Sequence, residues 1–298
     1  MALKGGPDMV LSQALISGTA IGFIYALIAL SMVLIYKSTD IINFAQGEMA
    51  MFSTFICFTL VSTYSIPLGL VLLLAFPIGA TIAAATERAV IRPLAGKSPL
   101  NSLIVAIALF YIFHYGAGWI WGYDAFPFPS LLPDKPLNVG GTFIAPSSLA
   151  IAGVSILVLA ILYVFLEHSR EGIAMRAASM NRNAARLMGI SVGRVSVLSW
   201  AIAGGIGAIA GLLAAPITFI DTQMMFFVLL KALAGAILGG FNSLPGAVIG
   251  GVLVGIIESL TTVYISAAFD DAIAFVVIVA VLMIKPEGLF GKPTVKKV

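Results

Sequence analysis

Cysteine, histidine and charged residues are all scarce in this chain. Its 298 residues include one cysteine and two histidines, and only 10% of them are charged. A single cysteine excludes an intrachain disulfide and leaves no cysteine cluster for zinc or an iron–sulfur centre. Because soluble proteins carry about 25% charged residues, this chain has too few charges to cover the surface of a soluble globule.

Chemical motifs are equally sparse. The sequence has no P-loop GxxxxGK[ST] for ATP, no TVGYG-like selectivity filter and no arginine repeat of the voltage-sensor type. It also has no nucleophile–base constellation and no plausible metal cluster. We therefore predict that the chain is not an enzyme and that it binds no cofactor or metal itself.

Apolar residues are abundant instead. They make up 60% of the chain, and the mean hydropathy is +1.10. This content excludes disorder and predicts an all-α bundle of transmembrane helices, each of about 20 residues. Because the runs at 224–240 and 271–284 are short, we expect eight or nine spans. They lie at about 10–36, 41–64, 66–86, 100–121, 147–166, 195–219, 224–240, 245–266 and 271–284.

Basic residues predict the orientation of this bundle. Thirteen of the sixteen fall on one side if nine spans alternate. The positive-inside rule makes that side cytoplasmic, with the N-terminus outside and the C-terminus inside. The basic pI is then a topology signal rather than a sign of nucleic-acid binding. The thirteen are Lys37, Arg88, Arg92, Lys97, Arg170, Arg176, Arg182, Arg186, Arg194, Lys285, Lys292, Lys296 and Lys297.

Two hydrophilic loops interrupt what we expect to be a single transmembrane domain of residues 1–298. The first, 122–147, is rich in proline and is predicted to be extracytoplasmic; it is either a connector or a contact for a soluble partner. The second, 167–194, is predicted to be cytoplasmic, with a helix at 172–188 that Gly189 ends. This helix could lie on anionic lipid or dock on a cytoplasmic protein.

Polar residues inside predicted spans are candidates for the substrate pathway. The richest group, at 40–48, includes Asn43, Gln46, Gly47 and Glu48. These residues either face a translocation route or only cap and pack a helix, with Thr39 or Asp40 as the cap. Lys231 is the other candidate, and it could pair with Glu258 on a neighbouring helix.

Glycines also recur at a spacing of four. Gly18 and Gly22, Gly235 and Gly239, and Gly251 and Gly255 are examples. This GxxxG spacing favours close helix contacts, within the chain or between subunits.

Four stretches resemble permeases of the LivH group. They are INFAQGE at 42–48, GIAMRAA at 172–178 followed by GI at 189–190, KALAGAILGGFNSLPGAVIGG at 231–251, and PEGLFG at 286–291. Their order and spacing are specific, and the resemblance covers about residues 12–293. Gln46 stands where well-known members of the family have histidine.

The resemblance implies an inner-membrane permease subunit of an ABC importer for branched-chain or related amino acids. It implies four kinds of partner: a second permease of the LivM type, ATPase subunits of the LivG and LivF types, and a periplasmic binding protein. ATP and Mg would be bound by the ATPases. Urea, amides or aromatic acids are alternative substrates, and a self-sufficient carrier or channel is a further alternative.

The same resemblance implies that the helix of the cytoplasmic loop is a coupling helix seated on an ATPase, which favours docking over lipid binding. The candidates for this contact are Gly172, Arg176, Ala177, Arg182, Arg186 and Gly189.

Overall fold

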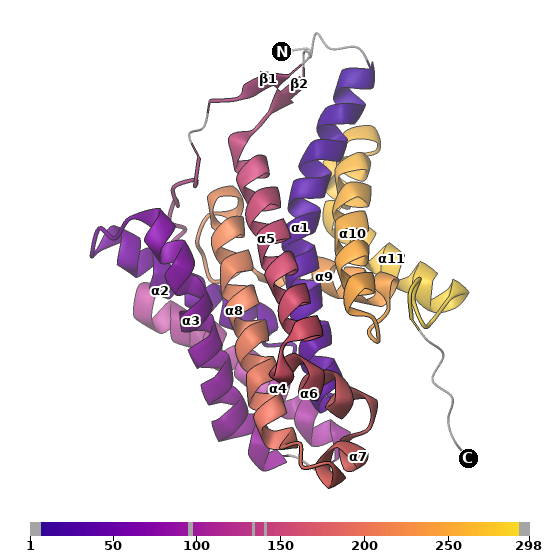
Figure 1. The fold of residues 1–298 in the computed structure, drawn as a ribbon. Coiled ribbons are helices and arrows are strands. Elements are labelled where there is room, and N and C mark those ends of the chain that lie inside the picture. Colours follow the sequence, from indigo (N-terminus) through magenta and orange to yellow (C-terminus); the bar gives the residue numbers. More distant parts are fainter. Residues whose placement is uncertain (1–6, 95–97, 133–134, 140–141, 292–298) are drawn as a thin grey trace.

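The computed structural model describes residues 7–94, 98–132, 135–139 and 142–291. These residues form eleven α-helices and one short β-hairpin, which confirms the predicted all-α class and adds two strands (Figure 1). The helices are α1 (Pro7–Thr39), α2 (Gln46–Ser62), α3 (Leu68–Thr86), α4 (Pro99–Trp121), α5 (Pro146–His168), α6 (Arg170–Met180), α7 (Arg182–Leu187), α8 (Val192–Thr218), α9 (Phe226–Gly239), α10 (Leu244–Tyr264) and α11 (Asp270–Ile284). The strands are β1 (Leu137–Val139) and β2 (Thr142–Ile144), paired antiparallel.

Serine caps set the start of several helices. Ser98, Ser169, Ser191 and Ser243 each accept a hydrogen bond from a backbone N–H in the first turn of α4, α6, α8 and α10. Such caps satisfy donors that a helix start leaves free. They place the helix boundaries close to the ends of the predicted apolar runs.

Two long helices form the centre of the bundle. Both α1 and α8 are buried along most of their length, whereas α3, α4, α5 and α11 expose large apolar side chains. In a membrane, those exposed side chains are suited to contact with lipid tails. Figure 1 shows α1 running from the end with the hairpin to the end with α6 and α7.

Glycine allows α10 to approach both of its neighbours closely. A Cβ on Gly22 of α1 would stand 2.7 Å from the carbonyl oxygen of Val252, and a Cβ on Gly235 of α9 would stand 2.7 Å from the Cα of Gly251. Neither distance leaves room for a side chain. Within the chain, the predicted GxxxG contacts at these positions are therefore confirmed.

Each of the nine predicted spans contains one helix. Not all nine of these helices are long enough to cross a bilayer. Seven helical segments among the described residues are long and apolar enough to cross a bilayer. The helix α2 has 17 residues and α9 has 14, fewer than the roughly 20 that a bilayer core needs. The expectation of eight or nine spans therefore stays a prediction.

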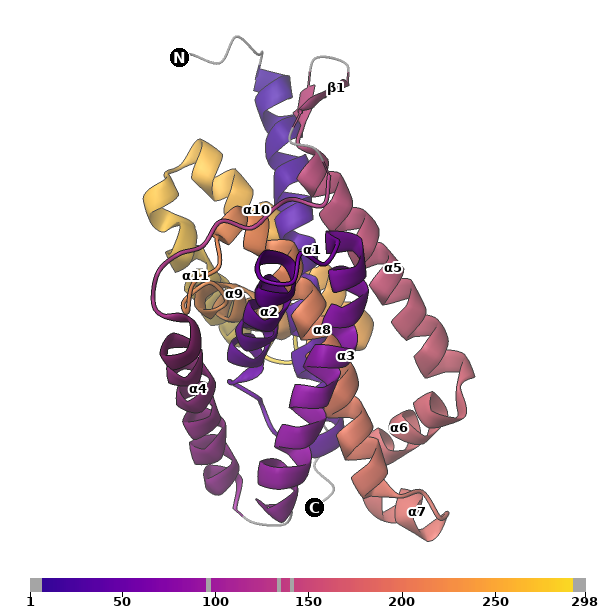
Figure 2. The same ribbon diagram turned by 90° about the vertical axis from the view of Figure 1, so that its left-hand side faces the viewer.

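Many of the described basic residues lie at one end of the bundle, but Lys135 directly precedes the hairpin at the other end and Lys231 is buried in α9. Lys37, at the end of α1, donates a hydrogen bond to the carbonyl oxygen of Asn242 at 3.2 Å, and α6 and α7 lie at the same end. In Figure 2 the connection from α4 to β1 leads to the hairpin at the opposite end. Lys97, Lys292, Lys296 and Lys297 lie outside the described residues. The assignment of the basic end to the cytoplasm stays a prediction.

The prediction of a single helix at 172–188, in the loop 167–194, is wrong in one respect. Residues 172–188 do not form one helix, because Asn181 has an extended backbone that separates α6 from α7. The Asn181 side chain accepts hydrogen bonds from Asn183 N and Ala184 N and so starts a new helix. The predicted end at Gly189 is confirmed: its φ is +82°, and Ile190 N donates to the carbonyl oxygen of Ala185.

Candidate functional site

The segment between α1 and α2 is a compact, hydrogen-bonded turn. Asp40 has a φ of +58°, and α2 begins only at Gln46. Neither Thr39 nor Asp40 caps α2, because Ala45 stands at the N-cap position and no side chain bonds there. Instead, the side-chain oxygen of Asn43 accepts a hydrogen bond from Ala45 N at 3.1 Å.

Asn43 and Gln46 join α2 to α8. Asn43 Nδ2 donates to Gln46 Oε1 at 3.4 Å, and Gln46 Nε2 donates to the carbonyl oxygen of Ala203 at 2.9 Å. Both side chains are fully buried. Gly207 makes the room, because a Cβ there would lie 2.7 Å from Gln46 Nε2. This geometry favours the packing interpretation of Asn43 and Gln46 over the pathway interpretation.

The next two candidates contact other helices. Gly47 faces α9, where its missing side chain leaves room for Met225 and Leu229. Glu48 is buried, and its Oε2 lies 3.1 Å from His114 Nδ1 of α4. Sequence reasoning missed His114; the signal was a lone histidine in an apolar run that needs a polar partner.

Lys231 occupies the centre of a cluster of ionisable side chains, which we call the Lys231 cluster. Its Nζ lies 3.0 Å from Glu258 Oε1, 3.2 Å from Asp270 Oδ2 and 3.3 Å from Asp271 Oδ1. Tyr25 of α1 donates its hydroxyl to Glu258 Oε1 at 3.0 Å. The predicted Lys231–Glu258 pair is confirmed. Sequence reasoning did not connect Lys231 with Asp270 and Asp271, which lie in the first turn of α11.

A cavity of about 480 Å³ adjoins this cluster at the C-terminal end of α8, and we call it the outer cavity. Its walls combine charged and apolar side chains from α1, α8, α9, α10 and the start of α11. They include Ile24, Tyr25, Ile217, Phe227, Lys231 and Glu258.

A second cavity of about 740 Å³ lies at the N-terminal end of α8, and we call it the inner cavity. Arg182 and Arg186 line it, and the Arg182 guanidinium forms an ion pair with Asp40 at 3.0 Å. The buried Glu87 accepts a hydrogen bond from the hydroxyl of Ser196 at 2.7 Å on the same wall. One central helix thus connects two polar cavities, while its middle is tightly packed.

The loop 167–194 combines buried residues with exposed apolar side chains. Gly172 and Ala185 are buried, and Arg176 forms an ion pair with Glu167. Ala177 of α6 is half-buried, and its carbonyl oxygen accepts a hydrogen bond from Asn181 N at the C-terminal end of that helix. By contrast, the loop exposes three large apolar side chains: Met180 (88% exposed), Leu187 (89%) and Met188 (82%).

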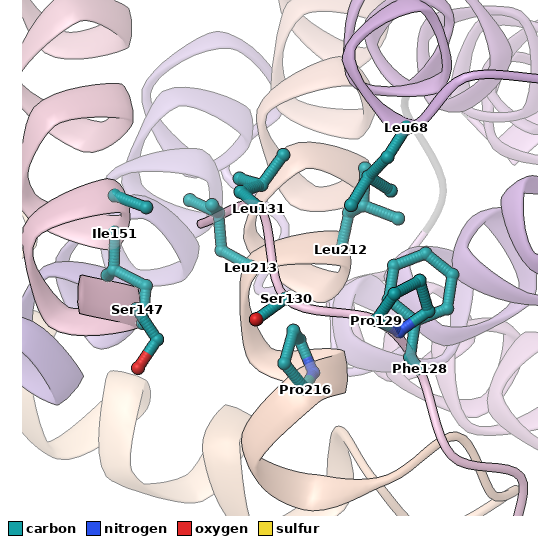
Figure 3. A pocket seen from close by; sticks show the side chains of 11 residues that line it. Leu68, Phe128, Pro129, Ser130, Leu131, Ser147, Ile151, Leu212, Leu213 and Pro216 are labelled. Atoms are coloured by element: carbon teal, nitrogen blue, oxygen red, sulfur yellow. The ribbon is translucent and has the colours of Figure 1, made fainter. Parts of the chain in front are cut away.

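The loop at the opposite end is held against α8. Phe126 and Ile220 exchange two backbone hydrogen bonds, of 2.9 and 2.8 Å. Figure 3 shows the following residues, Phe128–Leu131, beside Leu212, Leu213 and Pro216 of α8 and the first turn of α5. The proline-rich loop is therefore fixed, at Phe126, to the segment that borders the outer cavity.

Among the described residues, no three side chains of His, Cys, Asp or Glu are grouped as metal ligands. The polar groups instead join helices or face the two cavities.

Comparisons with known proteins place the chain in a family. A family described as "Branched-chain amino acid transport system / permease component" matches residues 14–282. The high-affinity branched-chain amino acid transport system permease protein LivH of Escherichia coli is 32% identical, over 96% of this chain and 97% of that protein. The corresponding BraD of Pseudomonas aeruginosa is 30% identical over the same shares.

A solved structure supports the fold alone. It is PsaBC from Streptococcus pneumoniae in complex with Fab, one chain of which matches with a TM-score of 0.51 and 12% identity over 93% of this chain and 92% of that chain. Together with the seven apolar helices, the family match identifies a multi-pass membrane protein. The chain belongs to the permease components of branched-chain amino acid ABC transport systems, a family of transport proteins rather than enzymes.

Proposed function

We propose that this chain forms one half of the membrane channel of an importer that moves a branched-chain amino acid through the inner membrane. The arrangement of α8 carries the proposal, because a polar cavity lies at each of its ends and a packed section lies between them. Alternating access requires such a closed section between two open ends, with two states that bind substrate differently.

The closed section is where α2 meets α8. Gln46 bonds to Ala203, and Gly211 packs against Ala50, where a Cβ would stand 3.1 Å from the carbonyl oxygen of Ala50. Opening a path between the cavities would require α2 and α8 to separate. The contacts between helices that would break and re-form in this step include those of Asn43, Gln46, Gly47 and Glu48. These residues would then control opening without binding the substrate.

The cytoplasmic loop is suited to receive force from an ATPase. Met180 at the end of α6, and Leu187 and Met188 at the end of α7, expose large apolar side chains, which we take together as one contact surface. Apolar side chains of this size dock well into a groove of a partner protein. We assign this surface, with Gly172, Arg176, Ala177, Arg182, Arg186 and Gly189 as its supporting residues, to contact with the ATPase.

The partners follow from the family. We infer a second permease of the LivM type, two ATPases of the LivG and LivF types that bind ATP and Mg, and a periplasmic binding protein. The loop 122–147 would face the binding protein, since its attachment to Ile220 connects it to the outer cavity.

Urea, amides and aromatic acids stay alternative substrates. A self-sufficient carrier is less favoured, because several of the buried ionisable side chains are paired with each other: Lys231 with Glu258, and Glu48 with His114.

The test is uptake into proteoliposomes that contain the chain with its co-encoded partners and the binding protein. Labelled leucine, isoleucine, valine, urea and an aromatic acid are supplied in parallel. We expect uptake of a branched-chain amino acid that vanishes without ATP. Flux through this chain alone, without ATP, would instead establish a carrier or channel.

A further inference from the structure

Three arginines and two carboxylates line the inner cavity, so its walls carry an excess of positive charge. Arg182 is paired with Asp40, and Glu87 is buried and hydrogen-bonded. Arg92 and Arg186 are exposed, and neither forms an ion pair or a side-chain hydrogen bond with another residue that the structure describes. The cavity therefore offers two free guanidinium groups, whose planar donors match the oxygens of a phosphate.

Two separate segments bring these guanidinium groups to the same cavity. Arg92 starts a short 3₁₀ turn, Arg92–Leu94, which follows α3. Its guanidinium lies so close to Gly193, in the first turn of α8, that a Cβ at this glycine would collide with it. Arg182 and Arg186 lie in α7, four residues apart, and so share one face of that helix.

An apolar groove of about 260 Å³ adjoins the inner cavity, and we call it the α4 groove. Phe44, in the turn before α2, and Leu103 of α4 line both spaces, so the two meet at these side chains. The remaining lining residues follow Leu103 at helical spacing and share its face of α4. They are Ile107, Phe110 and Tyr111.

The α4 groove has the place and the length that suit one acyl chain. The helix α4 stands at the edge of the bundle (Figure 2), and Leu103, Ile107 and Tyr111 are between 41% and 51% exposed. From Leu103 to Tyr111 the helix rises by about 12 Å. One half of the hydrocarbon core of a bilayer is about 15 Å thick. A chain in the groove would thus extend through most of one leaflet.

We propose that the inner cavity and the α4 groove together bind one anionic phospholipid. Its phosphate contacts Arg92 and Arg186, and one of its acyl chains lies along α4. Basic pockets between membrane helices at the cytoplasmic side bind anionic headgroups, and the adjoining groove selects a lipid rather than a soluble phosphate. The proposal goes beyond the proposed function and does not depend on which substrate is transported.

A lipid in this position joins segments that belong to different parts of the molecule. The phosphate holds α7 and the segment after α3, while the chain contacts α4 and the turn that contains Phe44. Leu187 and Met188 do not line the cavity and stay exposed for the ATPase. The lipid therefore stabilises the arrangement in which the section between the two cavities is closed.

Lipid retention by the complete complex tests the charge of the ligand. The delipidated complex is incubated with equal amounts of dioleoylphosphatidylglycerol and dioleoylphosphatidylcholine, which share their acyl chains, and native mass spectrometry counts the lipids that stay bound. We expect at least fivefold more phosphatidylglycerol. Arg92→Gln combined with Arg186→Gln should lower its retention at least fivefold. Arg170→Gln, at an exposed arginine that does not line the cavity, should leave retention unchanged.

Crosslinking tests the place of the acyl chain. The complex is exposed to light with a phosphatidylglycerol that carries a diazirine on one chain, and the modified residues are mapped. We expect the strongest modification between Leu103 and Tyr111. Ile107→Trp fills the groove and should lower this crosslink at least fivefold. Ile156→Trp, at a residue of α5 that is 54% exposed and lies outside the groove, is the matched control and should retain it.

Three results would overturn the proposal. They are equal retention of the two lipids, crosslinks spread evenly over the exposed helices, and displacement by glycerol 3-phosphate as effective as by dioctanoylphosphatidylglycerol. The last would show a site for a soluble anion. A preference for phosphatidylglycerol in the isolated chain that is lost in the complex would also overturn it, and would assign the arginines to the ATPase. If the double arginine variant fails to assemble, the lipid preference and the crosslink map of the unmodified complex still decide the question.

Discussion

At the scale of single residues, buried polar side chains in this protein mostly bind other helices. Gln46 is the clearest example, since both ends of its amide are engaged, with Asn43 on one side and Ala203 on the other. Its position within a family motif suggested a role toward substrate. Its hydrogen bonds assign it to the contact between α2 and α8, and a histidine at this position would also offer a donor to Ala203.

Replacing Gln46 should therefore weaken the protein rather than change its substrate. Gln46→Ala leaves a buried carbonyl and a buried amide without partners, which costs about 1–3 kcal/mol. We expect a lower melting temperature in detergent and an unchanged order of preference among leucine, isoleucine and valine. Gln46→His serves as the matched control and should recover part of the stability. A changed substrate order in Gln46→Ala would place this residue on the route.

At the scale of elements, small residues and loop geometry decide how the helices meet. The helices α1 and α10 touch through backbone atoms at Gly22 and Val252, which leaves no room for a methyl group. The cytoplasmic loop is divided by Asn181 into two helices. Its exposed apolar side chains therefore lie at the ends of two short helices, Met180 on α6 and Leu187 on α7.

The same substitution at two helical glycines should have different effects on stability. Gly22→Ala places a methyl group 2.7 Å from a backbone oxygen, and overpacking of this kind costs about 1–3 kcal/mol. Gly153→Ala in α5 has nothing within 4 Å and should be neutral or stabilise by up to about 1 kcal/mol. Thermal melting of both variants in detergent checks this. Equal melting temperatures would contradict the close contact of α1 with α10.

The exposed surface of α7 should matter only in the complex. Leu187 is 89% exposed, so Leu187→Asp should leave the melting temperature of the isolated chain unchanged. We expect ATP-dependent uptake to fall at least tenfold, with less ATPase copurifying, because a charge would enter an apolar contact. Leu187→Met keeps the surface apolar and should retain uptake. Normal uptake by the aspartate variant would exclude Leu187 from the contact.

At the scale of the whole molecule, much of the fold was predictable from hydropathy, and the sites were less so. Each predicted span contains a helix because long apolar runs have few other stable forms in a membrane. The split at Asn181 was missed because the surrounding alanines favour one continuous helix. The partners of Lys231 on α11 were missed because residues 39 positions apart meet only through the packing of whole helices. The pair of Lys231 with Glu258, on the neighbouring helix α10, could be predicted from the sequence.

The predicted orientation has a direct test in cells. In a Cys57→Ala background, Tyr64→Cys lies in the turn after α2 and Met180→Cys at the end of α6, both strongly exposed. We expect an impermeant thiol reagent, once admitted to the periplasm, to label Tyr64→Cys in intact cells. Met180→Cys should react only after the inner membrane is opened. The reverse pattern would invert the topology.

The junction between Phe126 and Ile220 has a consequence for how the sequence of the loop 122–147 can diverge among related transporters. Both of its hydrogen bonds join backbone atoms, which every residue except proline supplies, while Ile220 is fully buried and Phe126 packs against Phe58. Substitutions along the outer loop can therefore accumulate while the loop stays attached beside α8. Related transporters could in this way adapt the loop to different delivery proteins and keep the same mechanical connection to the membrane domain.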